Sequence, residues 1–106
     1  QTDAVGHCLY VNERWCQIAG LRPEQAAGFG WVEGIHPDDR ELVSTAWYAA
    51  ARANLPFRLE YRFQNAEGQI TWAFGQAVAE RNTTGEIVGY VGTITDISDR
   101  KSVERA

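Results

Sequence analysis

Residues 57–63 read Phe-Arg-Leu-Glu-Tyr-Arg-Phe, and this stretch decides the fold class. Its apolar and charged side chains alternate, which is the pattern of a strand with one face buried and the other in solvent. Residues 65–68, Asn-Ala-Glu-Gly, are typical of a hairpin turn. A second strand over 69–80, a turn over 82–85 and a third strand over 86–97 complete a predicted antiparallel meander.

The chain before this meander is predicted to form one short strand and several helices. Asn12 is a good N-cap residue, Gly20 is a natural helix stop, and Pro37 suits the first position of a longer amphipathic helix. We expect a strand over 8–11, helices over 13–19 and 23–27, a turn around 31–34, a long helix from 37 to about 54, and a final helix over 99–106. This order predicts an α+β domain with helices packed on one face of an antiparallel sheet.

Composition places the chain among ordinary globular domains. It has 106 residues, 44% of them hydrophobic, and a net charge of −4, so we expect one domain with a real core. The mildly acidic balance lacks the basic face that phosphate contacts need, so nucleic acid is not an expected partner. No apolar run reaches the ~20 residues that span a bilayer, so no membrane contact is expected. Cys8 and Cys16 show no metal or redox spacing, and we interpret them as free residues in a reducing cytoplasm, with a disulfide as the alternative.

Short motifs occur along the chain in a characteristic order. They are Thr2-Asp3 followed by Gly6, Tyr10-Val11-Asn12, residues 21–28, His36-Pro37-Asp38-Asp39-Arg40, Glu60-Tyr61-Arg62, Gly68 with Trp72, and Gly92-Thr93-Ile94-Thr95-Asp96-Ile97-Ser98. Together they resemble the PAS domain followed by its PAC half, in the bacterial variant found ahead of histidine kinases and diguanylate cyclases. The resemblance implies a PAS/PAC domain over 1–98 and the start of a C-terminal signalling helix over 99–106. A complete PAS domain begins with a further strand, of which Thr2-Asp3 looks like the end, so we expect the first strand to be truncated or missing.

The resemblance also places a ligand pocket between the long helix and the inner face of the sheet. Strand alternation and the family alignment together turn inward Leu59, Tyr61, Phe63, Ala73, Gly75, Ala77, Val88, Tyr90, Gly92 and Ile94. The small residues of this set leave volume, which either a small apolar or aromatic ligand or the protein's own aromatic side chains must fill. In the second case we expect Trp47 to lie over Ala73, Gly75 and Ala77. The candidate pocket residues are Trp31, Trp47, Ala51, Leu59, Tyr61, Phe63, Ala73, Gly75, Ala77, Tyr90, Gly92 and Ile94.

The resemblance argues against specific cofactors. Trp31 stands where flavin-binding relatives carry their reactive cysteine, and residues 38–54 contain no histidine of the kind that ligates haem in other relatives. We therefore expect no flavin and no haem, although an unidentified small molecule is compatible with the pocket. His36 beside Asp38 and Asp39 is interpreted as a helix-start device and not as a metal site, because a metal needs three or four convergent ligands.

The opposite face of the sheet is the candidate interface. Alternation turns Trp72, Phe74, Val78 and Val91 outward, and apolar patches of this kind mark interaction sites, so we expect a homodimer. Asp96, Ile97 and Ser98 are the candidate signal junction between the last strand and the final helix. Asp96 is expected to accept hydrogen bonds from the turn's backbone or to pair with a nearby arginine.

Two functional hypotheses follow. The first is a non-catalytic sensory and dimerisation module, which passes a ligand- or interface-induced change through the last strand and helix to a covalently linked output domain, a histidine kinase or diguanylate cyclase. The second is a small α+β enzyme that uses the central pocket for isomerase or hydratase chemistry. The second hypothesis needs a buried acid or base in the pocket, and the predicted inward set offers only Tyr61 and Tyr90 as polar groups.

Overall fold

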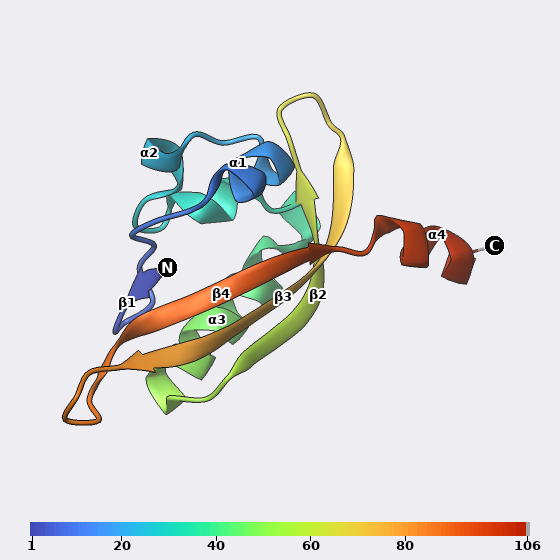
Figure 1. Cartoon of the computed structure of the whole chain (residues 1–106). Helices are drawn as coiled ribbons and strands as arrows, with labels where there is room; N and C mark the ends of the chain where they lie inside the picture. The colour runs from blue at the N-terminus through green and yellow to red at the C-terminus, as the bar shows by residue number, and fades with distance from the viewer. Residues whose placement is uncertain (106) are drawn as a thin grey trace.

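The computed structural model describes residues 1–105, with side chains described for residues 1–101. Its centre is one four-stranded antiparallel sheet with the strand order β1-β4-β3-β2 (Figure 1). The strands are β1 (Thr2–Asp3), β2 (Phe57–Gln64), β3 (Ile70–Arg81) and β4 (Ile87–Asp96). The predicted meander is therefore confirmed, with Tyr61 opposite Ala73 and Gly75 opposite Ile94 in the two registers.

The helices are gathered mainly on one side of this sheet, which confirms the predicted α+β class. They are α1 (Glu13–Ala19), α2 (Pro23–Ala26), the 3₁₀ turns η1 (Gly30–Gly34) and η2 (Pro37–Asp39), α3 (Arg40–Ala53) and α4 (Ser98–Arg105). Figure 1 shows α1, α2 and α3 on one side, whereas α4 continues from the end of β4 and projects away from the other helices. Residue 106 of the predicted final helix lies outside the described residues.

The helix limits follow from local capping. Asn12 accepts the Trp15 N–H at 2.9 Å, and Gly20 ends α1 in the left-handed conformation with φ 72°. The long helix was predicted to begin at Pro37, but its first turn is 3₁₀ and α3 begins at Arg40. Nδ1 of His36 accepts the Asp38 N–H at 3.1 Å, so His36 caps this first turn.

The strand predicted over residues 8–11 is wrong. Cys8 makes only isolated bridges, to Thr2 and to Gly28. The next two backbone N–H groups, of Leu9 and Tyr10, both donate to the carbonyl of Gln1, at 2.9 and 3.1 Å. Because two successive N–H groups donate to one carbonyl, the regular hydrogen-bond pattern of a β-sheet cannot continue along this segment. The side chains of Leu9 and Tyr10 remain largely exposed.

The first strand is present, although short. Thr2 pairs with Tyr90 and Asp3 with Gly89, so β1 occupies one end of the free side of β4. The sheet has four strands in the described part of the chain instead of the five of a complete PAS sheet. From Val91 to Asp96 the outer edge of β4 has no strand partner among residues 1–105.

A bulge corrects one predicted inward residue. Glu80 pairs with Gly89 and Arg81 pairs with Ile87, so Val88 has no partner of its own on β3. The extra residue reverses the alternation at this end of β4. Val88, predicted to face inward, is therefore 52% exposed, whereas Ile87 packs against the core.

The core lies between α3 and the inner sheet face. Trp47 is 7% exposed; its ring contacts Phe57 and Tyr90 edge to face, with centroids 5.3 and 5.6 Å apart. Its Nε1 donates to the Gly6 carbonyl at 2.9 Å. Trp47 is thus held at one end of the small-residue band and does not lie over all of it, because Phe57 pairs with Ala77 at that end.

Replacement of Trp47 by alanine tests this packing. The change removes a buried aromatic side chain and leaves the Gly6 carbonyl without its donor, so we expect the free energy of unfolding to fall by ~3–5 kcal/mol. The matched control is Leu42→Ala on the same helix, where the side chain is 59% exposed and the expected change is within ~0.5 kcal/mol. Urea denaturation of both variants provides the measurement, and equal stability of the two would refute the packing.

Candidate functional site

A cavity of about 590 Å³ lies between the inner sheet face and the elements that cover it. This volume is within the range of small-molecule sites. Eight of the predicted pocket residues line it, namely Trp31, Trp47, Tyr61, Gly75, Ala77, Tyr90, Gly92 and Ile94. Four residues of β2, β3 and β4 outside the predicted pocket set also line the cavity, namely Phe57, Gln76, Val91 and Thr93, and Val91 was predicted to face only outward.

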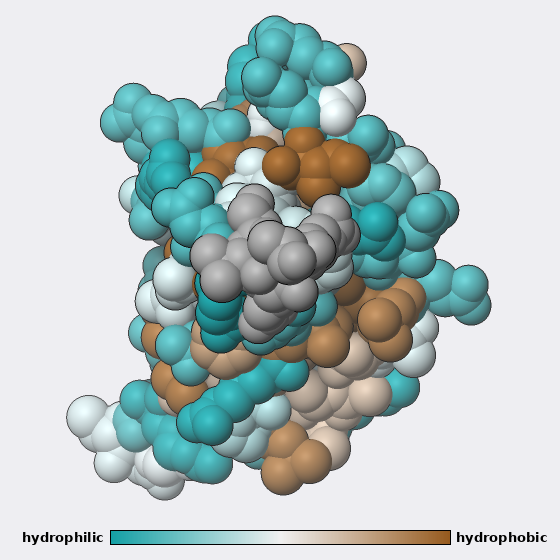
Figure 2. All heavy atoms as spheres, turned by 90° about the vertical axis from the view of Figure 1, so that its right-hand side faces the viewer, coloured by the Kyte–Doolittle hydropathy of each residue, from teal (hydrophilic) through white to brown (hydrophobic). Residues whose placement is uncertain are grey.

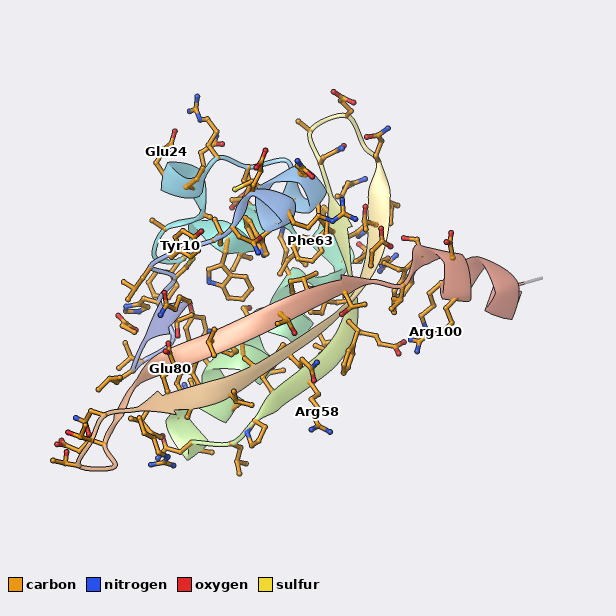
Figure 3. All side chains as sticks on the ribbon, in the orientation of Figure 1. Tyr10, Glu24, Arg58, Phe63, Glu80 and Arg100 are labelled. Atoms are coloured by element: carbon orange, nitrogen blue, oxygen red, sulfur yellow. The ribbon has the colours of Figure 1, made fainter. Side chains whose placement is uncertain are left out.

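Four predicted pocket residues do not line the cavity. Phe63 is covered by Trp15 of α1, whose ring centroid lies 5.9 Å away, and Ala73 beside it is fully buried. Figure 3 shows Phe63 between β2 and α1. Ala51 is buried near the end of α3, where its carbonyl accepts the Tyr90 hydroxyl at 2.9 Å, and Leu59 packs half-buried against the core. These residues belong to the packed core around the cavity.

Tyr61 forms the floor of the cavity together with Gly75. A Cβ at Gly75 would lie 2.7 Å from the Tyr61 hydroxyl oxygen and 2.8 Å from Cε1, so only glycine permits this ring position. Tyr61 is 6% exposed, and burial raises the pKa of its phenol above the usual range. The hydroxyl is therefore neutral at physiological pH and can donate or accept a hydrogen bond.

The N-terminal wall of the cavity was not predicted from the sequence. It consists of Gln1, Thr2, Cys8, Tyr10, Val11, Asn12, Arg14, Trp15 and Ile18. Figure 3 shows Tyr10 on the irregular segment that leads into α1. Residues 8–12 of this wall are irregular and carry no periodic pattern, so no sequence signal indicated which of them face the sheet. Arg14, Trp15 and Ile18 lie on α1, where the helical spacing of the apolar residues is a signal that could have found them.

Arg14 is the one charged side chain among the described residues that line the cavity. Its Nη2 lies 3.8 Å from Oδ2 of Asp96, which is too far for a hydrogen bond. Cys8 is the thiol of the lining, and burial raises its pKa, so it is uncharged at neutral pH. The described lining contains no Asp, Glu or His side chain that could exchange a proton with a ligand.

Asp96 ends β4 at the candidate junction. Its Oδ1 accepts the Ser98 N–H at 2.9 Å, at the beginning of α4. Ile97 is buried and donates its N–H to the Trp72 carbonyl at 2.9 Å. The Ser98 hydroxyl accepts the Trp72 N–H at 3.1 Å. The junction is thus hydrogen-bonded to the beginning of β3 on one side and forms a long ion pair with Arg14 of α1 on the other.

The outer face carries the candidate interface residues. Val78 and Val91 are directly opposite one another and are 55% and 43% exposed, and Phe74 on the same face is half-buried. Trp72 is less open than predicted, because Arg62 and Lys101 lie over its ring at 5.5 and 4.9 Å from the centroid. Figure 2 shows the end of the molecule nearest α4, where hydrophobic atoms form separate groups among hydrophilic ones.

Charged side chains also connect α4 to the sheet. Lys101 Nζ lies 2.8 Å from Glu60 Oε1, and Arg100 donates to the same carboxylate. The Lys101 and Arg100 hydrogen bonds lower the pKa of Glu60 below its usual value. These groups are solvent-exposed in part, so each pair contributes little stability alone.

Asp39 and Arg62 join the start of α3 to β2. Arg62 donates to the Asp39 carboxylate three times, from its backbone N–H at 2.9 Å, from Nε at 3.0 Å and from Nη2 at 2.7 Å. The Asp39 side chain is 14% exposed, and the side-chain hydrogen bonds from Arg62 hold the pKa of this carboxyl below its ordinary value. This bidentate pair fixes the position of β2 relative to the helical layer.

The lowered pKa of Asp39 predicts a pH-dependent contribution to stability. A depressed folded-state pKa stabilises the fold above the ordinary Asp value of 3.8, and this contribution is lost as the pH falls through the folded-state value. At neutral pH we expect Asp39→Asn to cost about 1–3 kcal/mol, and the difference from the parent to shrink in acid. Chemical denaturation from neutral pH down to strong acid measures it.

Asp38→Asn is the matched control for this prediction. Asp38 precedes Asp39 in the chain, but its side chain is 77% exposed and pairs only with His36 at 3.9 Å. Its replacement should change the stability by less than ~0.5 kcal/mol at neutral pH. Equal losses for the two variants would contradict the special role of Asp39.

The described residues contain no group of three or more His, Cys, Asp or Glu side chains able to hold a metal ion. Asp38 and Asp39 instead serve the start of the helical segment and the pair with Arg62. Across residues 1–105, no helix combines the length and the apolar character that a membrane crossing requires.

Comparison with known proteins places these features in context. A family model described as the PAS fold matches residues 8–94. The uncharacterised protein y4lL of Sinorhizobium fredii is 35% identical over 96 residues, which are 91% of this chain and 12% of that protein. The peroxide stress-activated histidine kinase mak1 of Schizosaccharomyces pombe is 28% identical over 100 residues, which are 94% of this chain and 6% of the kinase.

A solved structure shows the same architecture. The N-terminal domain of a diguanylate cyclase with PAS/PAC sensor from Marinobacter aquaeolei superposes with a TM-score of 0.76 at 20% identity, covering 91% of this chain and 89% of that one. The chain thus spans nearly all of an isolated sensor domain, but only about a tenth or less of the two longer relatives.

Proposed function

This chain belongs to the PAS-fold family, and on that premise we propose that it is a sensory and dimerisation module that transmits a change in its cavity through β4 and α4 to a covalently linked output domain. The observation that carries the proposal is the position of Asp96. Its carboxylate touches Arg14 of the cavity wall and, at the same time, accepts the Ser98 N–H that begins α4. A change in the cavity that moves Arg14 therefore acts directly on the first turn of α4.

The nature of the output domain follows from the relatives. The matched region of mak1 is part of a histidine kinase, and the Marinobacter domain is part of a diguanylate cyclase. We propose an output domain of one of these two kinds, reached through a continuation of α4. The two free cysteines, Cys8 and Cys16, are compatible with a reducing cytoplasmic location, which forms part of the proposal.

The cavity chemistry favours sensing over catalysis. Isomerase or hydratase chemistry needs a positioned acid or base with a pKa near neutrality. The described lining offers no Asp, Glu or His side chain, and burial raises the pKa of the Tyr61 phenol and of the Cys8 thiol above their ordinary values. We further propose that neither flavin nor haem occupies the cavity, because Trp31 stands in its lining at the flavin-cysteine position and α3 contains no histidine.

A fusion tests transmission through Asp96. The chain is joined through α4, in continuous helical register, to a dimeric histidine-kinase core, and autophosphorylation is measured. Asp96→Ala removes both the Ser98 N–H acceptor and the Arg14 partner, so we expect the basal rate to change several-fold. Asp38→Ala, an exposed aspartate distant in sequence from α4, should leave the rate unchanged. A fusion indifferent to Asp96→Ala would refute the proposed function.

The dimerisation part of the proposal rests on the outer sheet face. Phe74, Val78 and Val91 share this face, and burying an aromatic and two valines per partner contributes to a stable contact. We expect the parent chain to sediment as a dimer at high micromolar concentration and the double variant Phe74→Glu, Val78→Glu to sediment as a folded monomer. Val88→Glu is the control, since Val88 is equally exposed but lies on the bulge. A monomeric parent or a dimeric double variant would contradict this interface.

A further inference from the structure

Two polar side chains of the cavity have hydrogen-bonding capacity that the described residues leave unused. The Tyr61 hydroxyl lies over Gly75 in the cavity lining, and no residue in the described part of the chain shares a hydrogen bond with it. The Arg14 guanidinium has only the 3.8 Å approach of Asp96, which is an ion pair without a hydrogen bond. A hydroxyl that can donate or accept a hydrogen bond and a guanidinium that can donate several therefore line one cavity, where a single ligand can offer a partner to each.

The two groups mark separate points along one cavity. Gly75, beneath the phenol, pairs with Ile94 on β4, and Asp96 lies two residues further on the same face of that strand. Two residues of an extended strand span about 7 Å. The distance between the phenol and the Arg14–Asp96 pair is therefore of about this size. A small ligand can therefore meet both groups at once.

Much of the remaining lining is apolar. It includes Trp15, Ile18, Trp31, Val43 and Ile94. Such a wall favours a flat aromatic or compact aliphatic body, which it removes from water. Because Arg14 is the one charged side chain of the described lining and no carboxylate lines the cavity, the lining complements a negative charge and disfavours a positive one.

We propose that the cavity binds an aromatic monocarboxylate, whose carboxylate takes Arg14 away from Asp96 and whose distal polar group meets the Tyr61 hydroxyl. A carboxylate accepts two parallel hydrogen bonds from a guanidinium, which the long contact with Asp96 does not provide. The ligand thus replaces a weak, exposed ion pair with a stronger one. Asp96 then loses a partner while it still accepts the Ser98 N–H, so ligand binding changes the start of α4.

This inference rests on the proposed function, because it names the input of the same cavity. It also assigns a regulatory step that the cavity alone does not imply. A neutral ligand of the same shape can occupy the apolar part of the cavity, but it leaves the pair between Arg14 and Asp96 in place. Only the charged ligand should therefore alter the junction.

A matched series of probes tests the charge requirement on the intact chain. Indole-3-acetate, indole-3-acetamide and tryptamine share one ring system and differ in charge at the side-chain end. By isothermal titration calorimetry we expect the acid to bind roughly tenfold more tightly than the amide, and the amine to bind most weakly. At saturation, the acid should shift the NMR signal of the Ser98 amide, and the amide probe should not.

Three variants assign the effect to named residues. Arg14→Gln should reduce the affinity for the acid to that for the amide, whereas Arg22→Gln, at an exposed arginine paired with Glu24 outside the cavity, should change neither. Tyr61→Phe should lower the affinity for the acid and the affinity for the amide by the same several-fold factor. The reason is that, in the proposed pose, the phenol meets the indole N–H and not the carboxylate. The two contributions can therefore be distinguished, because the Arg14 variant changes the affinity for the acid alone and the Tyr61 variant changes the affinity for both probes.

The outcomes distinguish this inference from the proposed function. Equal binding of acid and amide, an Arg14→Gln variant that keeps its preference for the acid, or no binding of the acid would overturn the inference, and the kinase fusion would still report on sensing. The opposite combination is also informative. If the chain prefers the acid but Asp96→Ala leaves autophosphorylation of the fusion unchanged, the proposed ligand class stands and the proposed signalling role is overturned. Tighter binding of the acid, lost in Arg14→Gln and accompanied by the Ser98 shift, is the result that supports the inference.

Discussion

The absence of a side chain at Gly75 is the constraint on which the inner face of the sheet depends. It allows the Tyr61 ring to lie against β3, where a Cβ would stand 2.7 Å from the hydroxyl oxygen. Trp47 is large enough to fill the space above, but its hydrogen bond to Gly6 and its contact with Phe57 hold it at one end. The cavity exists because Gly75 lets the Tyr61 ring lie close to β3, and because Trp47 is held at one end and does not fill the space above that ring.

The last strand joins a firmly held end to a loosely held end. At one end the Tyr90 hydroxyl is buried and bonded to the Ala51 carbonyl, so β4 is fixed to α3. At the other end Asp96 is partly exposed and has only a long contact with Arg14 beside its bond to Ser98. A segment with few buried contacts opens at lower free energy than a packed one, so movement is expected at the Asp96 end.

The outer face provides a second connection to α4. Asp39 holds Arg62, Arg62 lies over Trp72, and Lys101 of α4 lies over the same ring. The beginning of α3 is thereby linked to α4 through side chains on the face opposite the cavity. A partner docked on Phe74 and Val78 would adjoin this series of contacts, so cavity occupancy and dimerisation can act on the same helix.

The sequence by itself determined the three strands of the meander, through the alternation over 57–63 and the turns that follow, and the limits of α1, through its caps Asn12 and Gly20. These features depend on neighbours in the chain, which is why local patterns predicted them. Only the tertiary structure decided that residues 8–11 form an irregular cavity wall and that Trp47 is held by Gly6, 41 positions away. It also decided that Arg14 meets Asp96, because contacts between distant segments are set by how the helical layer packs on the sheet, which no local pattern encodes.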